Sequence, residues 1–111
     1  MSTKAQILGD TDFYEISPEI KKYALLDVGF QETKQGNFRL ERPINGDSPY
    51  DARYFLKVTI SKDFSNLKMS TTDKSGLHSL NIFKSKNTTQ EIEDFRYLMK
   101  FLIEKNILVK R

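Results

Sequence analysis

The sequence predicts an α+β fold: an antiparallel sheet with two helices on one of its faces. Apolar and polar residues alternate between residues 53 and 83, as in half-buried strands. Two other segments, residues 17–29 and 88–105, have helical spacing and helix-end signals. With 111 residues and 38% hydrophobic content, the chain is expected to form a single domain over residues 1–111.

The first elements are expected to be two short strands and a helix. Residues 5–8 and 13–16 are the strand candidates. In the helix, Ser17 is the expected N-cap, Pro18 the first position and Gly29 the residue just past the end. Its expected buried stripe is Ile20, Tyr23 and Ala24, widened by Leu25 and Leu26.

A hairpin and an irregular segment should follow. Residues 30–34 and 38–42 resemble two strands closed around Gln35-Gly36, with a loop of either two or three residues. Residues 43–51 contain two prolines and an Asn-Gly pair, so an irregular connection is expected there.

Three consecutive antiparallel strands are then expected at residues 53–62, 67–72 and 77–83. If four-residue turns join them, Ile60 faces Met69, Met69 faces Leu80, and Leu67 faces Ile82. These apolar pairs, together with Val58, all lie on one side of the sheet. A slip of one residue would move one strand's apolar set to the other face, so the pattern predicts the register.

The last and longest helix is expected to run to about Lys105. Thr88 and Glu91 have the spacing of a capping box at its start. Its core-facing side should carry Ile92, Phe95, Leu98, Met99, Leu102 and Ile103. Residues 107–109 are a candidate for a terminal strand.

This order of elements is similar to one half of the TATA-box-binding-protein fold, a likeness that transfers no function. A closer resemblance lies in five short motifs. They are Ser17-Pro18-Glu19-Ile20-Lys21-Lys22-Tyr23, Gly29-Phe30, Gly36-Asn37-Phe38, Ser61-Lys62-Asp63, and Gly76-Leu77 through Asn81-Ile82-Phe83. Through them the chain resembles, over nearly its whole length, a small family of Gram-positive bacterial proteins called domain of unknown function 1831. The resemblance implies a TATA-binding-protein-like domain linked to amino-acid metabolism, of cysteine and methionine in particular. It implies no catalytic residue.

The sequence contains no recognisable catalytic or metal-binding pattern. There is no cysteine, which excludes disulfides, thiolate metal sites and a cysteine nucleophile. The five glycines are isolated, so no phosphate-cradling loop is present. The one histidine, His78, is expected to be half-buried opposite Thr71, and one histidine makes a poor metal site. We therefore expect a non-enzymatic protein without cofactor or metal. No segment is apolar enough for a signal peptide or a membrane helix, so a soluble, cytoplasmic protein with no membrane contact is expected.

The exposed face of the predicted sheet is the first candidate binding surface. The net charge of +3 divides into −3 over residues 1–52 and +6 over residues 53–111. The expected binding residues on this face are Phe55, Lys57, Lys68, Ser70, Asn81 and Phe83. Lysines beside aromatic side chains can hold single-stranded nucleic acid, which is the alternative function that the sequence suggests.

The last helix offers the second candidate surface. Tyr97 and Phe101 are four residues apart and point away from the core stripe, so they could contact a protein partner or a second copy of the chain. The end of the chain or the 43–51 segment could equally cover them. The favoured interpretation is an accessory or binding protein that acts through a protein partner or a small ligand.

Overall fold

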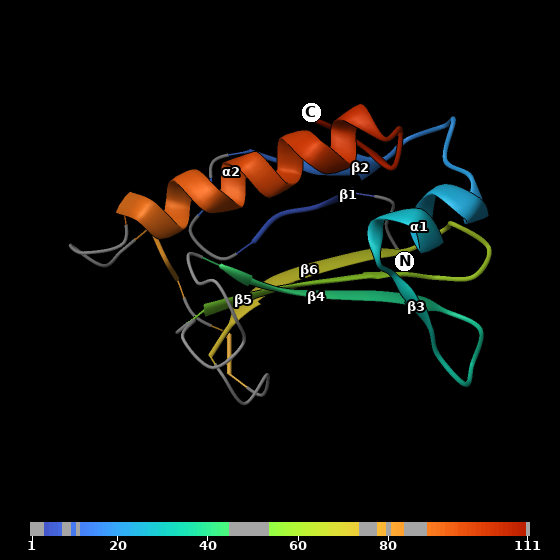
Figure 1. Ribbon diagram of the computed structural model, residues 1–111, viewed down its shortest axis with the longest axis horizontal. Helices are drawn as coiled ribbons and strands as arrows, with labels where there is room; N and C mark the ends of the chain where they lie inside the picture. Colours follow the sequence, from blue (N-terminus) through green and yellow to red (C-terminus); the bar gives the residue numbers. More distant parts are fainter. Residues whose placement is uncertain are drawn as a thin grey trace.

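The computed structural model describes residues 4–7, 10, 12–44, 54–73, 78–79, 81–83 and 89–110. It confirms the α+β class: two helices accompany two antiparallel sheets (Figure 1). The first sheet contains β1 (Lys4–Ala5), β2 (Tyr14–Ile16) and β7 (Leu108–Lys110), in the order β1-β2-β7. The second contains β3 (Gln31–Glu32), β4 (Phe38–Ile44), β5 (Tyr54–Ile60) and β6 (Leu67–Thr72), in the order β3-β4-β5-β6.

The two ends of the chain meet in the first sheet. The expected terminal strand exists as β7 and pairs antiparallel with β2, with Ile16 opposite Leu108. On the other side of β2, Ala5 of β1 lies opposite Tyr14. Strand β1 also contacts β6, so the first sheet adjoins the edge of the second (Figure 1).

The register between β5 and β6 differs from the expected one by two residues. Ile60 pairs with Leu67 and Val58 with Met69, so the expected Ile60–Met69 pairing is wrong. The reason is a six-residue loop, closed by a 3.0 Å hydrogen bond from the Ser61 N–H to the Asn66 carbonyl. Because side chains alternate with a period of two, a shift of two residues leaves the apolar set on the same face.

The expected third strand of this run, residues 77–83, is not a regular strand in its described part. Residues 78–79 and 81–83 make one isolated bridge, between Thr72 and Ser79. Ile82 is buried but lies in a turn, so it does not pair with Leu67. The expected place of His78 is also wrong: the residue is exposed, and its carbonyl accepts the N–H of Asp73 at 3.2 Å. Leu80, and with it the expected Met69–Leu80 pair, lies outside the described residues.

Helix α1 (Lys22–Val28) begins later than expected. Residues 17–20 form a turn instead, in which the Ile20 N–H donates to the Ser17 carbonyl and the Glu19 N–H donates to Ser17 Oγ. Pro18 suits the second position of such a turn as well as the first position of a helix, so the sequence signal was ambiguous.

The end of α1 at Gly29 is confirmed. Gly29 has a φ of 108°, and the Phe30 N–H donates to the Leu25 carbonyl at 3.0 Å, the bond that closes a left-handed helix end. The expected stripe is partly wrong. Leu25 and Val28 are the buried residues, whereas Tyr23 is 64% exposed and Leu26 46% exposed. Ala24 and Ile20 are partly buried against the core, so the side of α1 that carries Tyr23 and Leu26 is the one that faces solvent.

Helix α2 (Thr89–Glu104) confirms the expected stripe. Phe95, Met99 and Leu102 are buried, and Ile92, Leu98 and Ile103 are partly buried against the same core. Thr88 lies outside the described residues, so its capping role stays a prediction. Both helices share one core with the inward residues of β4 and β5, and Figure 1 shows them on the same side of the four-stranded sheet.

The hairpin before β5 closes with a longer loop than expected. Glu32 pairs with Phe38, so residues 33–37 form the loop. The Thr33 N–H donates to the Asn37 carbonyl at 2.7 Å. Pro43 and Ile44 belong to β4 and not to an irregular connection.

Within the described residues, neither helix has the length and apolar character that crossing a membrane requires.

Candidate functional site

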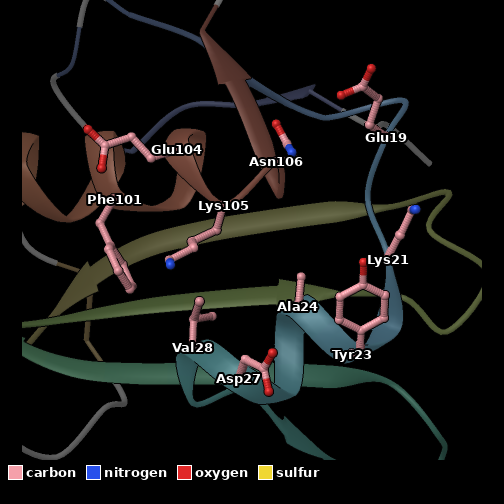
Figure 2. A pocket seen from close by; sticks show the side chains of 10 residues that line it. All are labelled: Glu19, Lys21, Tyr23, Ala24, Asp27, Val28, Phe101, Glu104, Lys105 and Asn106. Carbon is pink, nitrogen blue, oxygen red and sulfur yellow. The ribbon is translucent and has the colours of Figure 1, made fainter.

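A cleft of about 670 Å³ lies between α1 and the end of α2 (Figure 2). Its volume falls in the range of about 300–1,000 Å³ that is usual for small-molecule sites. The residues that line it are Glu19, Lys21, Tyr23, Ala24, Asp27, Val28, Phe101, Glu104, Lys105 and Asn106. Two segments that are distant in the sequence therefore form the walls.

The floor of the cleft is apolar. Ala24 and Val28 are four residues apart on α1 and so lie on the same face of the helix. Phe101 points into the cleft from α2, facing them (Figure 2). Val28 is buried, whereas Ala24 and Phe101 are half-buried, so the floor retains apolar surface that a ligand could cover.

The rim of the cleft carries both signs of charge. Lys21 and Lys105 are the cations, and Glu19, Asp27 and Glu104 are the carboxylates. The Lys105 Nζ lies 5.7 Å from the centre of the Phe101 ring, which holds a cation above the apolar floor. Among the described residues, no ion pair within 4.0 Å engages any of these five groups. The arrangement can bind an apolar group and both charges of a zwitterion.

The turn after α2 shapes one end of this cleft. Asn106 has a φ of 61°, and the Ile107 N–H donates to the Leu102 carbonyl at 3.0 Å. This left-handed ending reverses the chain into β7 and leaves Glu104, Lys105 and Asn106 at the cleft. The ends of both helices are therefore fixed by backbone hydrogen bonds next to the cleft.

The candidate pair on α2, Tyr97 and Phe101, does not form one exposed patch. Tyr97 is 68% exposed, whereas Phe101 is half-buried and lines the cleft. The expectation that both point away from the core is thus wrong for Phe101. Tyr23, which the sequence pattern placed in the core, is the exposed aromatic side chain on the cleft rim. Helical periodicity could not show this, because it does not reveal where α2 ends relative to α1.

The candidates on the sheet face separate into two groups. Lys57, Lys68 and Ser70 line a shallow groove, and Phe55 lies on the same face of β5 by alternation. Phe83 does not share that face: its ring meets the Phe95 ring edge-on, with centroids 6.2 Å apart. The Asn81 Oδ1 accepts the Phe83 N–H at 2.9 Å, a bond within the turn that places the Phe83 ring against α2. The expected aromatic and basic platform is therefore incomplete.

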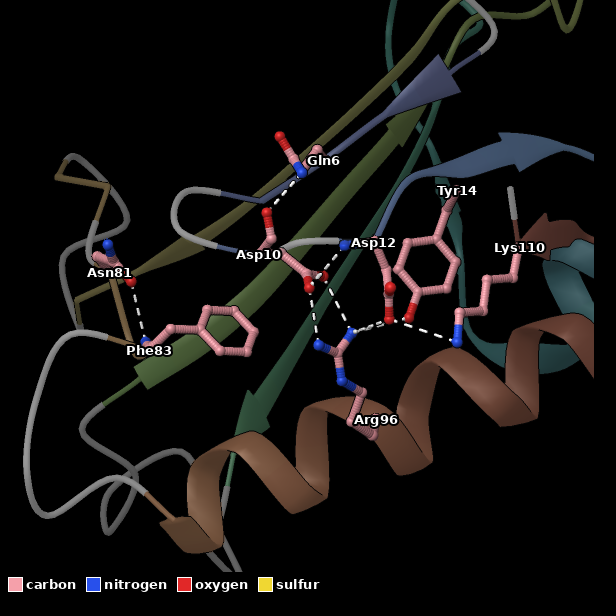
Figure 3. A network of polar contacts seen from close by, with 8 residues as sticks. All are labelled: Gln6, Asp10, Asp12, Tyr14, Asn81, Phe83, Arg96 and Lys110. Atoms are coloured by element: carbon pink, nitrogen blue, oxygen red, sulfur yellow. Dashed lines mark hydrogen bonds and ion pairs between the residues drawn. The ribbon is translucent and has the colours of Figure 1, made fainter.

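A network of polar residues that the sequence analysis missed joins α2 to the first sheet (Figure 3). Arg96 donates to both oxygens of Asp10, at 2.7 and 3.0 Å, and to Tyr14 Oη at 3.1 Å. It also lies 3.2 Å from Asp12, which pairs with Lys110 at 3.4 Å. The Asp10 side chain is fully buried, so a bidentate arginine is the partner that it needs.

The network shifts two pKa values. The hydrogen bond to Asp10 raises the pKa of Arg96, and burial opposes this effect. Burial raises the pKa of Tyr14, although the hydrogen bond from Arg96 lowers it. Both shifts favour a protonated guanidinium and a neutral phenol, the forms in which Arg96 donates to Asp10 and to Tyr14. Among the described residues, no three histidine, aspartate or glutamate side chains gather as a metal site.

Comparisons with known proteins identify a family and a similar solved structure. A family model for domain of unknown function 1831, described as having a suggested role in amino-acid metabolism, matches residues 1–109. A crystal structure of a protein of that family from Lactobacillus plantarum is similar, with a TM-score of 0.90 and 37% sequence identity. The match covers 99% of this chain and 96% of the Lactobacillus chain. No curated protein matches the sequence.

Proposed function

Because the chain belongs to the domain of unknown function 1831 family, we propose that it is a binding protein for a free amino acid with an apolar side chain. The ligand occupies the cleft between α1 and the end of α2. The observation that carries this proposal is the combination of an apolar floor with charges of both signs on one rim, which form no ion pair within 4.0 Å among the residues that the structure describes.

The chemistry of the cleft suggests how such a ligand is oriented. The apolar side chain lies over Ala24 and Val28, against the ring of Phe101. The ligand carboxylate meets the Lys105 ammonium, and the ligand ammonium meets Asp27 on the opposite wall. A ligand with one charge would leave one of these two groups without a partner.

The sizes of the expected interactions predict weak affinity. Ion pairs near the surface contribute about 0.2–1 kcal/mol each. Burial of one apolar side chain contributes about 1.5–3 kcal/mol. Together these contributions reach about 5 kcal/mol at most before the loss of translational freedom is subtracted, so a Kd of about 1 mM or weaker is expected. This range suits a protein that responds to the concentration of a free metabolite.

The two earlier alternatives have less support. The partner interpretation relied on Tyr97 and Phe101 as one patch, and the two side chains lie in different surroundings. The nucleic-acid interpretation relied on Phe55 and Phe83 beside the lysines, and Phe83 packs on Phe95. Sequence-tolerant binding of single strands usually needs stacked aromatic side chains on the basic face.

Titration of the isotope-labelled protein with leucine, followed by two-dimensional NMR, tests the proposal. Saturable shifts are expected at the amides of Ala24, Asp27, Val28 and Lys105. Glycine, leucinamide and N-acetylleucine each lack one of the three features that the cleft recognises. Glycine should bind about tenfold more weakly than leucine or worse, because it loses the buried side chain. Leucinamide and N-acetylleucine should each bind about two- to fivefold more weakly, because each loses one ion pair.

Variants of the cleft provide the second part of the test. Asp27→Asn and Lys105→Gln should each weaken leucine binding about two- to fivefold. Glu93→Gln and Lys100→Gln are matched controls, because both residues are exposed on α2 and do not line the cleft. Two results would reject a zwitterion site. One is that the cleft variants and the control variants weaken leucine binding equally. The other is that leucinamide and N-acetylleucine bind as tightly as leucine does.

A further inference from the structure

A second concave surface lies where β1 adjoins the β5–β6 hairpin. It is a shallow groove of about 510 Å³. Lys57 and Thr59 come from β5, Lys68, Met69 and Ser70 from β6, and Ala5 and Gln6 from the first strand and the residue after it. Lys57, Thr59, Lys68 and Ser70 lie on the sheet face opposite the buried residues of β5.

The register makes these four side chains a two-by-two array. Lys57 is paired with Ser70, and Thr59 is paired with Lys68. The two ammonium groups therefore occupy one diagonal and the two hydroxyls the other. Diagonal neighbours on antiparallel strands are about 7–8 Å apart, a spacing that long side chains can close around a single ion.

No carboxylate neutralises this pair of lysines in the described part of the chain. Glu41 is the residue that pairs with Lys57 on β4, but its carboxylate lies 3.4 Å from Arg39 on its own strand. Neither Lys57 nor Lys68 has a carboxylate within 4.0 Å among the described residues. Lysines at diagonal positions of neighbouring strands carry like charges that repel, and a bound anion would reduce that repulsion.

We propose that this array binds the phosphate group of a small phosphorylated molecule. A phosphate monoester is close to a dianion at neutral pH, so its charge matches two ammonium groups. The hydroxyls of Thr59 and Ser70 donate to its remaining oxygens. The groove extends beyond the array to Ala5 and Gln6, which leaves space for the rest of the molecule. The site is distinct from the cleft between the helices and does not depend on the proposed amino-acid function.

A carboxylate ligand fits the array less well. A carboxylate has one charge and two oxygens, so it neutralises only one of the two lysines and offers fewer acceptor atoms to the hydroxyls than a phosphate does. A nucleic acid would need a longer basic track, and Phe83 is not available beside it. The array therefore favours one compact dianion.

NMR titrations at constant ionic strength test this proposal, with inorganic phosphate and glycerol 3-phosphate as probes and acetate as the comparison. Phosphate is expected to cause saturable shifts at the amides of Thr59, Lys68 and Ser70. Acetate should bind about tenfold more weakly, since it matches only one of the two charges. Glycerol 3-phosphate should bind at least as tightly as phosphate and also shift the Gln6 amide.

The double variant Lys57→Gln/Lys68→Gln should weaken phosphate binding by about tenfold or more. The double variant Lys34→Gln/Lys100→Gln changes the net charge equally at exposed positions outside the groove, and it should bind as the wild type does. Unfolding curves should show that both double variants remain folded.

Three results would overturn the proposal: no saturation by phosphate, equal binding of acetate, or equal weakening by the two double variants. A single-stranded oligothymidylate that binds more tightly than phosphate, with affinity falling steeply as salt rises, would indicate a nucleic-acid surface instead.

Discussion

Arg96 joins parts of the chain that lie far apart in the sequence. Its guanidinium donates to Asp10 and Tyr14 (Figure 3). The same group lies 5.3 Å from the centre of the Phe83 ring and 5.4 Å from that of Phe95. Arginine suits this position because its planar fork matches a carboxylate while its flat face stacks on aromatic rings. Helix α2 is thereby tied to the segment that leads into β2.

Substitution of Arg96 by methionine should be strongly destabilising. The methionine fills a similar space, but the fully buried Asp10 carboxylate loses its counterion. Removal of one partner from a buried ion pair usually costs about 3–5 kcal/mol, and the partial exposure of Arg96 places the expected loss near the lower end. Urea unfolding measures this loss. Lys100→Met, one turn further along α2, is the control and should change stability by less than about 0.5 kcal/mol. A small loss in Arg96→Met would show that Asp10 is not held by this pair.

The loop between β5 and β6 shows how one element depends on a few polar atoms. Ser61 Oγ accepts the N–H groups of Ser65 and Asn66, both at 3.0 Å, and donates to Asp63 at 2.8 Å. These bonds stabilise the six-residue loop and hence the pairing of Ile60 with Leu67. The hydrogen bonds from Ser65 and Ser61 also lower the pKa of Asp63. Hydrophobic alternation could not predict this loop, because it is equally satisfied by registers two residues apart.

Replacement of Ser61 by alanine should destabilise the hairpin by about 1–2 kcal/mol, because the N–H groups of Ser65 and Asn66 each lose a 3.0 Å hydrogen bond. The Ser65 N–H then keeps its longer bond, of 3.2 Å, to Asp63 Oδ1. The amides of residues 65 and 66 should also lose protection in hydrogen exchange. Ser70→Ala is the control, since Ser70 is in the same hairpin but outside the loop. If Ser61→Ala and the control lose equal stability, the hydroxyl does not determine the loop.

At the scale of the whole molecule, the C-terminal strand completes a sheet that begins at the N-terminus. Ile107 and Leu108 are fully buried, and the Ser17 N–H donates to the Ile107 carbonyl at 3.0 Å. The same turn borders the cleft, through Lys105 and Asn106. Stability and the cleft geometry are therefore linked at the end of α2.

Truncation of Ile107 to alanine should lower the free energy of unfolding by about 2–5 kcal/mol, because apolar burial is lost and a cavity remains. It should also weaken leucine binding, because the turn that positions Lys105 loosens. Val109→Ala is the matched control: Val109 lies in β7, two residues after Ile107, but is only half-buried, so its truncation should cost less. Thermal unfolding and the leucine titration provide the two measurements. If Ile107→Ala lowers stability without any change in binding, the strand does not position the cleft.

The sequence alone was sufficient for the fold class, the core stripe of α2, the end of α1 at Gly29 and the terminal strand. These features depend on periodicity and on local backbone preferences, which act within a few residues. It also indicated correctly that Lys57, Lys68 and Ser70 share one surface, because alternation survives an error of two residues.

Only the tertiary structure decided the rest. The cleft, the Arg96 network and the inward place of Phe83 each bring together segments that are separated in the sequence. No local sequence pattern predicts such contacts, because they depend on how helices and sheets pack and on where loops end. Asp10 illustrates the reason: in the sequence it is an ordinary loop carboxylate, and only packing buries it and gives it an arginine 86 residues away.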